Sequence, residues 1–250
     1  MESRSNAQGE ESTLPLLATS PFAPQNEQVT PLAMVRGENL SRAALGVQAP
    51  ALLFVAVVWS LVLSSMPLTT LPLFGYHPLI QSFAILLLLQ AIVVLQRTTA
   101  SQPSAKKSAF TAHQWLNLLL VLPLFTAGAS IMWYLHDAPT SAHFISYHGI
   151  LGTAVVVAAW AQAALGAASV WWKAKLVGGE NRGKALWKWH RLSGYVLVAL
   201  FLATAALGVL ETTWAQQKAS ALQKTAVVLG LVGATAALVG RVQKSKLPKL

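Results

Sequence analysis

The chain has 250 residues, of which 54% are hydrophobic and 10% charged, and it contains no cysteine. Because soluble domains carry about 25% charged residues, this composition favours an integral membrane protein over a soluble one. The net charge of +10 suggests nucleic acid as a partner only if the protein is soluble. The missing cysteines exclude disulfides, thiolate metal sites and covalent c-type haem attachment.

Residues 1–48 differ in composition from the rest of the chain. They are rich in Ser, Pro, Gln, Asn and Glu, hold five of the eight acids, and show no periodic apolar pattern. This composition predicts a disordered tail. The segment has no basic run followed directly by an apolar one, so it does not read as a cleaved signal peptide.

Long stretches without Lys, Arg, Asp or Glu follow this tail. They are residues 51–96, 114–135, 149–172, 192–210 and 225–240. A bilayer-spanning helix needs about 20 mostly apolar residues, and the first stretch is long enough for two helices, with three prolines and a glycine near its middle. The sequence therefore predicts an all-α bundle of six transmembrane helices, at residues 49–66, 78–96, 113–135, 146–172, 187–210 and 222–240. We expect residues 49–240 to form this domain and residues 241–250 to form a basic tail.

Basic residues are distributed unevenly between the predicted connections. The two tails, the connection between the second and third helices and the connection between the fourth and fifth carry sixteen of the eighteen Lys and Arg. Only Lys218 and Lys224 fall on the other side. Cytoplasmic loops of membrane proteins are enriched in Lys and Arg, so we expect both termini to be cytoplasmic. The positive charge then marks a membrane face and does not indicate nucleic acid.

Four of the six histidines stand where an apolar stretch begins: His77, His113, His148 and His190. The order of the helices places His77 and His148 at the non-cytoplasmic face, and His113 and His190 at the cytoplasmic face. Ionisable residues within spans are costly and usually functional. A single histidine at such a position can also serve as an anchor or a hydrogen-bonding group, but four with matched placement favour two cofactor sites.

The number of histidines at each face favours haem over a simple metal ion. Two histidines leave a tetrahedral zinc or copper site half empty unless carboxylates or thiolates complete it. Haem provides four equatorial nitrogens and takes two axial ligands from the protein. Glycine and alanine are frequent in the fourth helix, which leaves room for a flat cofactor or, equally, for close helix packing. We therefore expect two non-covalent, bis-histidine haem b groups.

Several short motifs resemble those of the cytochrome b561 family. His77-Pro78-Leu79 is similar to the family's opening of helix two, and Lys106-Lys107 ahead of His113 is similar to its basic lead into helix three. Tyr147-His148-Gly149 and Trp189-His190 resemble its ligand segments in helices four and five, and the segment 206–211 (Ala-Leu-Gly-Val-Leu-Glu) resembles its closing of helix five. The likeness covers residues 50–212, and the ordered set is more specific than any one motif.

The resemblance implies the axial pairs His77/His148 and His113/His190 and a transmembrane oxidoreductase reaction. Members of the family take single electrons from cytoplasmic ascorbate and give them to monodehydroascorbate or a ferric chelate on the other side. Lys106 and Lys107 are then candidates for binding ascorbate, or ordinary positive residues of a cytoplasmic loop. His136 has the spacing from His148 of an outer-side substrate histidine in the ascorbate-type members. His136 and His143 are either groups that bind an outer acceptor or solvated loop residues, and the second reading is favoured for His143.

The sequence departs from the ascorbate-type members at two places. Phe110 stands where they carry a second histidine before helix three, and residues 146–150 (Ser-Tyr-His-Gly-Ile) replace their Ser-Leu-His-Ser-Trp. The closer likeness is to the cytochrome b561 domain-containing subgroup of transmembrane ferric reductases, in which the spacing of Ala142-His143 and His148 recurs.

Two other classes of function stay open at this point. One is an electron-transfer subunit that a protein partner or a quinol reduces, with the basic segment 173–191 as its docking face. The other is a haem-free transporter or scaffold. The exposed faces of the helices permit a homodimer without requiring one.

Overall fold

The computed structural model describes residues 42–96, 103–137, 139, 141–242 and 247–248. Most of the predicted tail 1–48 and six residues of the predicted tail 241–250 lie outside the described residues. Within the described part, six helices are long and apolar enough to cross a membrane, which confirms the predicted all-α six-helix bundle. These are α2 (Arg42–Ser65), α3 (Leu73–Gln96), the continuous helix Pro103–His136, α6 (Tyr147–Val170), α7 (Glu180–Leu210) and α9 (Ala221–Arg241). Short helices η1 (Leu68–Thr70), η3 (Trp171–Val177) and α8 (Thr213–Lys218) lie in the connections.

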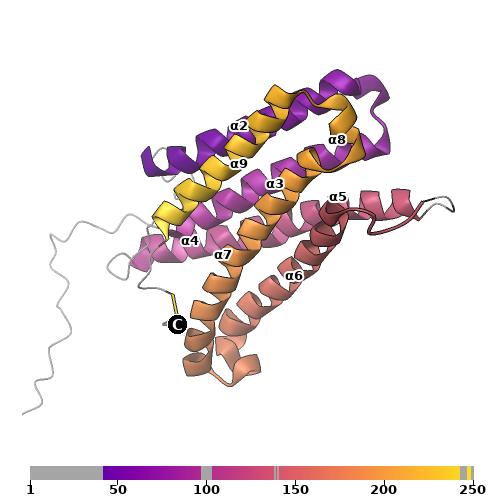
Figure 1. Ribbon diagram of the computed structural model, residues 1–250. Coiled ribbons are helices and arrows are strands. Elements are labelled where there is room, and N and C mark those ends of the chain that lie inside the picture. Colours follow the sequence, from indigo (N-terminus) through magenta and orange to yellow (C-terminus); the bar gives the residue numbers. More distant parts are fainter. Residues whose placement is uncertain (1–41, 97–102, 138, 140, 243–246, 249–250) are drawn as a thin grey trace, which may run out of the picture.

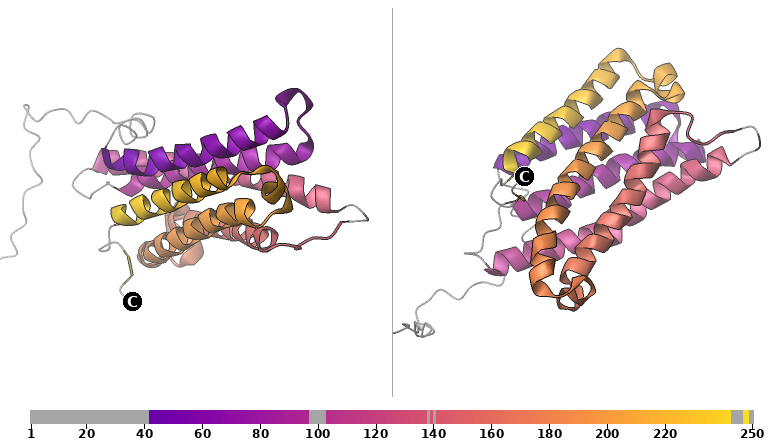
Figure 2. Two further views of the ribbon diagram at one scale, coloured as in Figure 1. Left: turned by 45° about the horizontal axis from the view of Figure 1, so that its top comes forward. Right: turned by 60° about the horizontal axis from the view of Figure 1, so that its bottom comes forward.

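The spanning helices form a four-helix ring with a helix pair against one side. Around the ring, α3 packs on the helix Pro103–His136, which contacts α6, which packs on α7, which returns to α3. Helices α2 and α9 pack along each other and against α3 and α7 (Figures 1 and 2). Chain neighbours run antiparallel, so α3 and α6 begin at one end of the bundle. The third and fifth spans begin at the other end, where α9 finishes.

Four helices begin at least five residues earlier than their apolar stretches predict. Helix α2 begins at Arg42 and not at 49, α3 begins at Leu73 and not at 78, and the third and fifth spans also begin early. The helix predicted at 113 begins at Pro103, and the one predicted at 187 begins at Glu180. Proline suits a first helical position, and Glu180 is an acid in a first turn, where the helix dipole favours it. The added turns of the third and fifth spans are basic, so hydropathy alone does not reveal them. As a result His113 and His190 are each the eleventh residue of their helix.

The helix Pro103–His136 changes its hydrogen bonding near its middle. Helix α4 (Pro103–Trp115) passes into a π-helical segment, η2 (Leu116–Val121), and then into α5 (Leu122–His136). The Asn117 side chain donates to the main-chain carbonyl of His113 over 2.7 Å. Pro123, which lacks an N–H, follows this segment at once. Such π segments occur frequently at functional sites, and this one begins three residues after His113.

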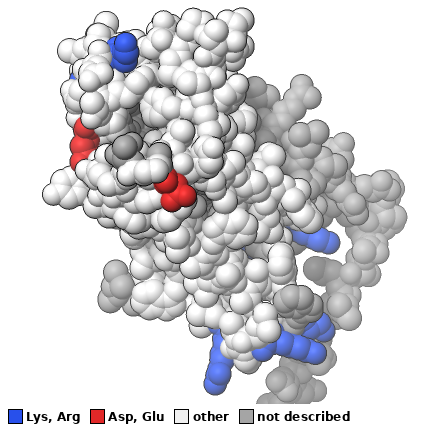
Figure 3. All heavy atoms as spheres, turned by 90° about the vertical axis from the view of Figure 1, so that its right-hand side faces the viewer, with Lys and Arg blue, Asp and Glu red and all other residues white. Residues whose placement is uncertain are grey.

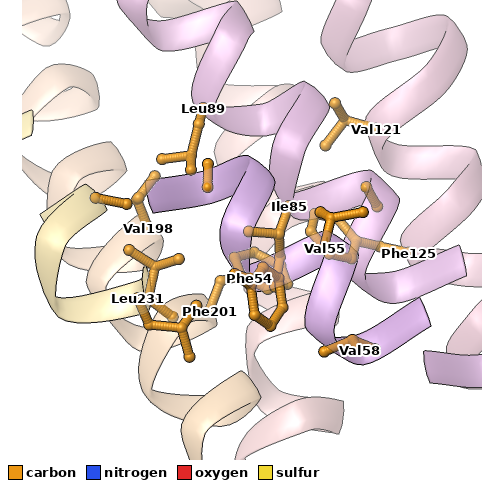
Figure 4. Close-up of a cluster of buried hydrophobic side chains, with 14 of the residues drawn as sticks. Phe54, Val55, Val58, Ile85, Leu89, Val121, Phe125, Val198, Phe201 and Leu231 are labelled. Carbon is orange, nitrogen blue, oxygen red and sulfur yellow. The ribbon is translucent and has the colours of Figure 1, made fainter. Parts of the chain in front are cut away.

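The interior between the two ends of the bundle is apolar. The buried cluster draws on α2, α3, η2, α5, α6, α7, α8 and α9, with Phe54, Leu89, Val121, Val198 and Leu231 among its members (Figure 4). At its centre the rings of Phe125 and Phe201 stack, with centroids 4.2 Å apart and planes 16° apart. Aromatic stacking of this kind adds about 0.5–1.5 kcal/mol to the burial of the rings. The core therefore ties α5 to α7.

Candidate functional site

His77 and His148 face each other at the end of the bundle where α3 and α6 begin. Their ring centroids are 6.0 Å apart and their planes are at 88°. A metal ion about 2.0 Å from each of two imidazole nitrogens places the ring centroids roughly 6 Å apart. The spacing of the two rings therefore matches what one axially ligated iron requires.

Both rings are held by main-chain carbonyls of a neighbouring helix. The Nδ1 atom of His77 lies 2.8 Å from the carbonyl oxygen of Gly128 on α5. The Nδ1 atom of His148 lies 2.9 Å from the carbonyl oxygen of Thr204 on α7. Because a carbonyl accepts, each Nδ1 carries the proton, and each Nε2 is left as the unprotonated nitrogen that a metal ligand requires.

A cavity of about 560 Å³ opens beside this pair, within the size range of cofactor sites. Its lining is mostly apolar and comes from α2, α3, α5, α6, α7 and α8. Phe125 and Phe201 bound it on the side of the buried core. His136 and His143 also line it, so the structure brings both of these predicted residues to the cavity of His77 and His148.

His113 and His190 form the second pair, at the opposite end of the bundle. His113 lies on α4 and His190 on α7, each in the eleventh position of a helix that begins at this end. The Nδ1 atom of His113 lies 2.8 Å from the carbonyl oxygen of Ala91 on α3. The Nδ1 atom of His190 is buried and finds no hydrogen-bond partner among the described residues. The structure thus brings the rings of His77 and His148 face to face and puts His113 and His190 together at the other end of the bundle.

Glycines on α6 and α7 leave room beside two of these rings. A Cβ atom at Gly208 would lie 3.2 Å from Cε1 of His148, and a Cβ atom at Gly166 would lie 2.8 Å from Cε1 of His190. Both distances are shorter than ordinary carbon–carbon contact, which is about 3.5–4.0 Å. A side chain at position 166 would therefore force the His190 ring to shift, and one at position 208 would press on the His148 ring.

The donor set fits haem better than a bare metal ion. The described residues contain no group of three or more His, Cys, Asp or Glu that could hold a metal. Two histidines beside an apolar cavity are what a non-covalent haem requires. The buried Nδ1 of His190 is a polar atom without a partner among the described residues, and the glycines at 166 and 208 leave space beside the rings of His190 and His148.

The predicted substrate residues are divided between the two ends. Lys106 and Lys107 are exposed on the first turns of α4, at the end of His113. His136 ends α5, and its Nδ1 lies 2.8 Å from the carbonyl oxygen of Met132. His143 packs on Trp133, with ring centroids 4.3 Å apart, and its Nε2 is 3.9 Å from a carboxylate oxygen of Asp137.

Charged side chains are sparse at the end that holds the cavity. Figure 3 looks onto the side with α8 and the α5–α6 connection, which is largely uncharged apart from two acidic groups and basic groups near its edges. Asp137 and Glu211 are the described acids of this end. The opposite end carries most of the described basic residues, in α4, in η3 and in the first turns of α7. The charge asymmetry predicted from the sequence is thus present in the described part of the fold.

Two polar side chains at these sites were not predicted. Gln162 of α6 donates from Nε2 to the carbonyl of His190 over 2.5 Å and accepts from the Ser193 hydroxyl over 2.9 Å. Glu211 accepts from the main-chain N–H groups of Tyr147 and His148, each over 2.9 Å. A lone glutamine within an apolar helix and a lone acid at a helix end were the signals that could have identified them.

The sequence matches a model of a known protein family over more than half of its length. The sequence model described as "Eukaryotic cytochrome b561" matches residues 76–216, more than half of the chain. The matched region begins just before His77 and ends within α8, so it contains all four histidines and all of the four-helix ring except the first three residues of α3. A search of curated proteins gave no match.

Proposed function

The chain belongs to the eukaryotic cytochrome b561 family, whose members are haem-binding transmembrane oxidoreductases, and on this basis we propose that it binds two haem b groups and carries single electrons across a membrane. The observation that supports this most directly is the pairing of histidines at both ends of one bundle, with His77 and His148 at a separation suited to one iron. His113 and His190 would hold the second haem.

The chain's own residues hold and orient the ligands. The carbonyls of Gly128, Thr204 and Ala91 fix the tautomers of three histidines, and such contacts also raise the basicity of a ligand. When bound, haem supplies the reversible one-electron exchange, for which no side chain of this protein is suited. The apolar lining of the cavity excludes water from the cofactor edge, and water exclusion and burial both act on its potential.

The orientation follows from the charge distribution. We assign the end rich in basic residues to the cytoplasm, because short cytoplasmic loops are enriched in Lys and Arg. Residues 1–48 and 241–250 are then cytoplasmic tails. His113 and His190 form the inner site, and His77 and His148 form the outer site.

Ascorbate is the proposed cytoplasmic donor, and Lys106 and Lys107 are placed to attract its negative charge. Each ascorbate monoanion would give up one electron, release one proton to the cytoplasmic water and become the monodehydroascorbate radical. The proposed outer acceptor is monodehydroascorbate or a ferric chelate, which gains that electron. His136 and His143 line the outer cavity and are the candidates for contacting this acceptor.

An absorption spectrum of the purified full-length protein tests the proposal. We expect a b-type spectrum that ascorbate reduces and that a ferric chelate reoxidises, with two haems per chain. A protein without a reducible b-type spectrum would be a haem-free transporter or scaffold. One haem per chain would overturn the two-site assignment.

A second candidate is an electron-transfer subunit reduced by a protein partner or a quinol. The segment from η3 into the first turns of α7 favours it, because six basic residues lie between Lys173 and Arg191, with exposed Trp187 and Trp189 among them. Rapid reduction of the pure protein by ascorbate would argue against this alternative. Reduction only after a quinol or a reductase is added would support it.

A further inference from the structure

Glu211 stands at an unfavourable place for an acid within its own helix. It follows the last residue of α7, and its N–H donates to the carbonyl of Leu207 over 2.8 Å. The carbonyl end of a helix carries partial negative charge, which disfavours a carboxylate by a few tenths of a kcal/mol to about 1 kcal/mol. Local helix physics therefore does not explain a glutamate here, and its stabilisation must come from another element.

That element is the start of α6. One carboxylate oxygen of Glu211 accepts from the N–H of Tyr147 and the other from the N–H of His148, each over 2.9 Å. These are the first two N–H groups of α6, which have no acceptor within the helix. The third is satisfied by the Ser146 hydroxyl. Together the two side chains satisfy the first turn of the helix that carries His148.

The same face of α7 also contacts the side chain of His148, at two positions. The Thr204 carbonyl accepts from the ring, and Gly208 leaves the space that the ring occupies. Positions 204, 208 and 211 have the i, i+4, i+7 spacing of one helix face. The ring of His148 is thus held by α7 at Thr204 and Gly208, and its main-chain N–H is held further along the same helix face by Glu211.

We infer that Glu211 is a positioning residue for His148, fixing the main chain of this outer ligand against α7. The inference rests on the proposed function, in which His148 is an axial ligand. His77 is the fifth residue of α3 and has no such carboxylate on its main chain among the described residues. Glu211 also lines the cavity, so its carboxylate would lie near a haem held there and would stabilise the ferric state relative to the ferrous state.

The hydrogen bonds are tested first on the unaltered full-length protein by amide hydrogen exchange resolved to single residues. We expect the amides of Tyr147 and His148 to exchange at least tenfold more slowly than those of Ala221 and Leu222. The latter are the first two amides of α9 at the same end of the bundle, and they find no acceptor among the described residues. Equal exchange at the two helix starts would overturn the inference, whether or not haem is present.

The positioning role is tested with Glu211→Gln and Glu211→Ala, with Glu180→Gln as the matched control. Glu180 begins α7 at the other end of the bundle. We expect Glu211→Gln to retain two haems, to raise the midpoint potential of one haem only, and to change the EPR signal of that same ferric haem, because this signal depends on the orientation of the axial imidazoles. Glu211→Ala should shift both readouts further or lose that haem.

The outcomes separate this inference from the proposed function. If the unaltered protein binds no haem, the proposed function fails, and the exchange experiment alone decides whether Glu211 holds the start of α6. If the unaltered protein binds two haems and both Glu211 variants match Glu180→Gln in potentials and EPR signal, Glu211 is not a positioning residue.

Discussion

Gly166 on α6 lies against the ring of His190 on α7, where a Cβ atom would come within 2.8 Å of Cε1. The converse contact joins the same two helices, because Gly208 on α7 lies against the ring of His148 on α6. In both helices the glycine follows the histidine by eighteen residues. Gly152 and Thr204 face each other in the same antiparallel register. The packing of α6 against α7 in this one register therefore forms part of the site at His148 and part of the site at His190.

Substituting Gly166 by alanine should damage the inner site selectively. The new methyl group overlaps a buried ring that is not the end of a flexible side chain, and overpacking of this kind costs about 1–3 kcal/mol. We expect partial loss of one haem and a lower unfolding temperature, measured by haem content per chain and by thermal unfolding in detergent. Gly240→Ala is the control, because no atom lies within 4 Å of a Cβ there. Equal behaviour of the two variants would contradict the close contact.

Replacing His190 by alanine should remove the inner haem and stop transmembrane reduction. The variant lacks one axial ligand, and Gly166 then faces an empty space. We expect the haem content to fall to about half and the reduction of an external ferric chelate by enclosed ascorbate to cease in proteoliposomes. His143→Ala, which changes a residue outside both pairs, should keep both haems. Full haem content and unchanged reduction of the external chelate in His190→Ala would contradict the assignment of His190 as a haem ligand.

Gln162→Leu should loosen α6 from α7 at the inner end. The substitution keeps the approximate volume but leaves the carbonyl of His190 without its side-chain amide donor. The His190 carbonyl still accepts from the Ser193 hydroxyl over 3.2 Å, so we expect a loss of about 0.5–1.5 kcal/mol, the net contribution of one hydrogen bond. Thermal unfolding of the detergent-solubilised protein measures this loss. Ser193→Ala is the milder comparison, because it removes the hydroxyl that donates to the Gln162 side chain and to the Trp189 carbonyl. A larger loss of thermal stability in Ser193→Ala than in Gln162→Leu would contradict the prediction.

The double variant Lys106→Ala, Lys107→Ala should weaken the use of ascorbate without affecting haem. Exposed charges each contribute less than about 1 kcal/mol to binding an anion, so we expect a several-fold rise in KM for ascorbate with kcat nearly unchanged. The effect should shrink at high salt because of screening. Lys218→Ala with Lys224→Ala, at the other end of the bundle, should leave KM unchanged. An unchanged KM in the first pair would exclude these lysines from donor binding.

Much of the fold follows from the apolar stretches. Each span is long enough to be recognised by hydropathy, and the antiparallel order of six spans brings His77 to the end of His148 and His113 to the end of His190. This placement needs no knowledge of side-chain packing. The outer pair, with rings 6.0 Å apart, shows how closely the histidines of one end meet.

Other features could not be predicted in this way because they depend on rotation about a helix axis. Nothing in the composition indicates that Gly208 faces His148, or that the Glu211 carboxylate reaches across to the start of α6. The basic turns at the start of α4 and α7 have no apolar periodicity, so their helices were predicted ten and seven residues too short. The π-helical segment η2 arises from hydrogen bonding between turns, which residue types alone do not specify.

The stacked rings of Phe125 and Phe201 have a consequence for the energetics of transport. They belong to an apolar core between the two histidine pairs, and the charged residues of the described spans lie toward the ends of the bundle. An electron that crosses this core therefore travels without a proton or a counterion at its side. Its passage is then a net movement of charge, and the membrane voltage adds or removes about 2.3 kcal/mol for each 100 mV across the full bilayer. The rate of reduction at the outer face should for this reason respond to voltage as well as to the concentrations of donor and acceptor.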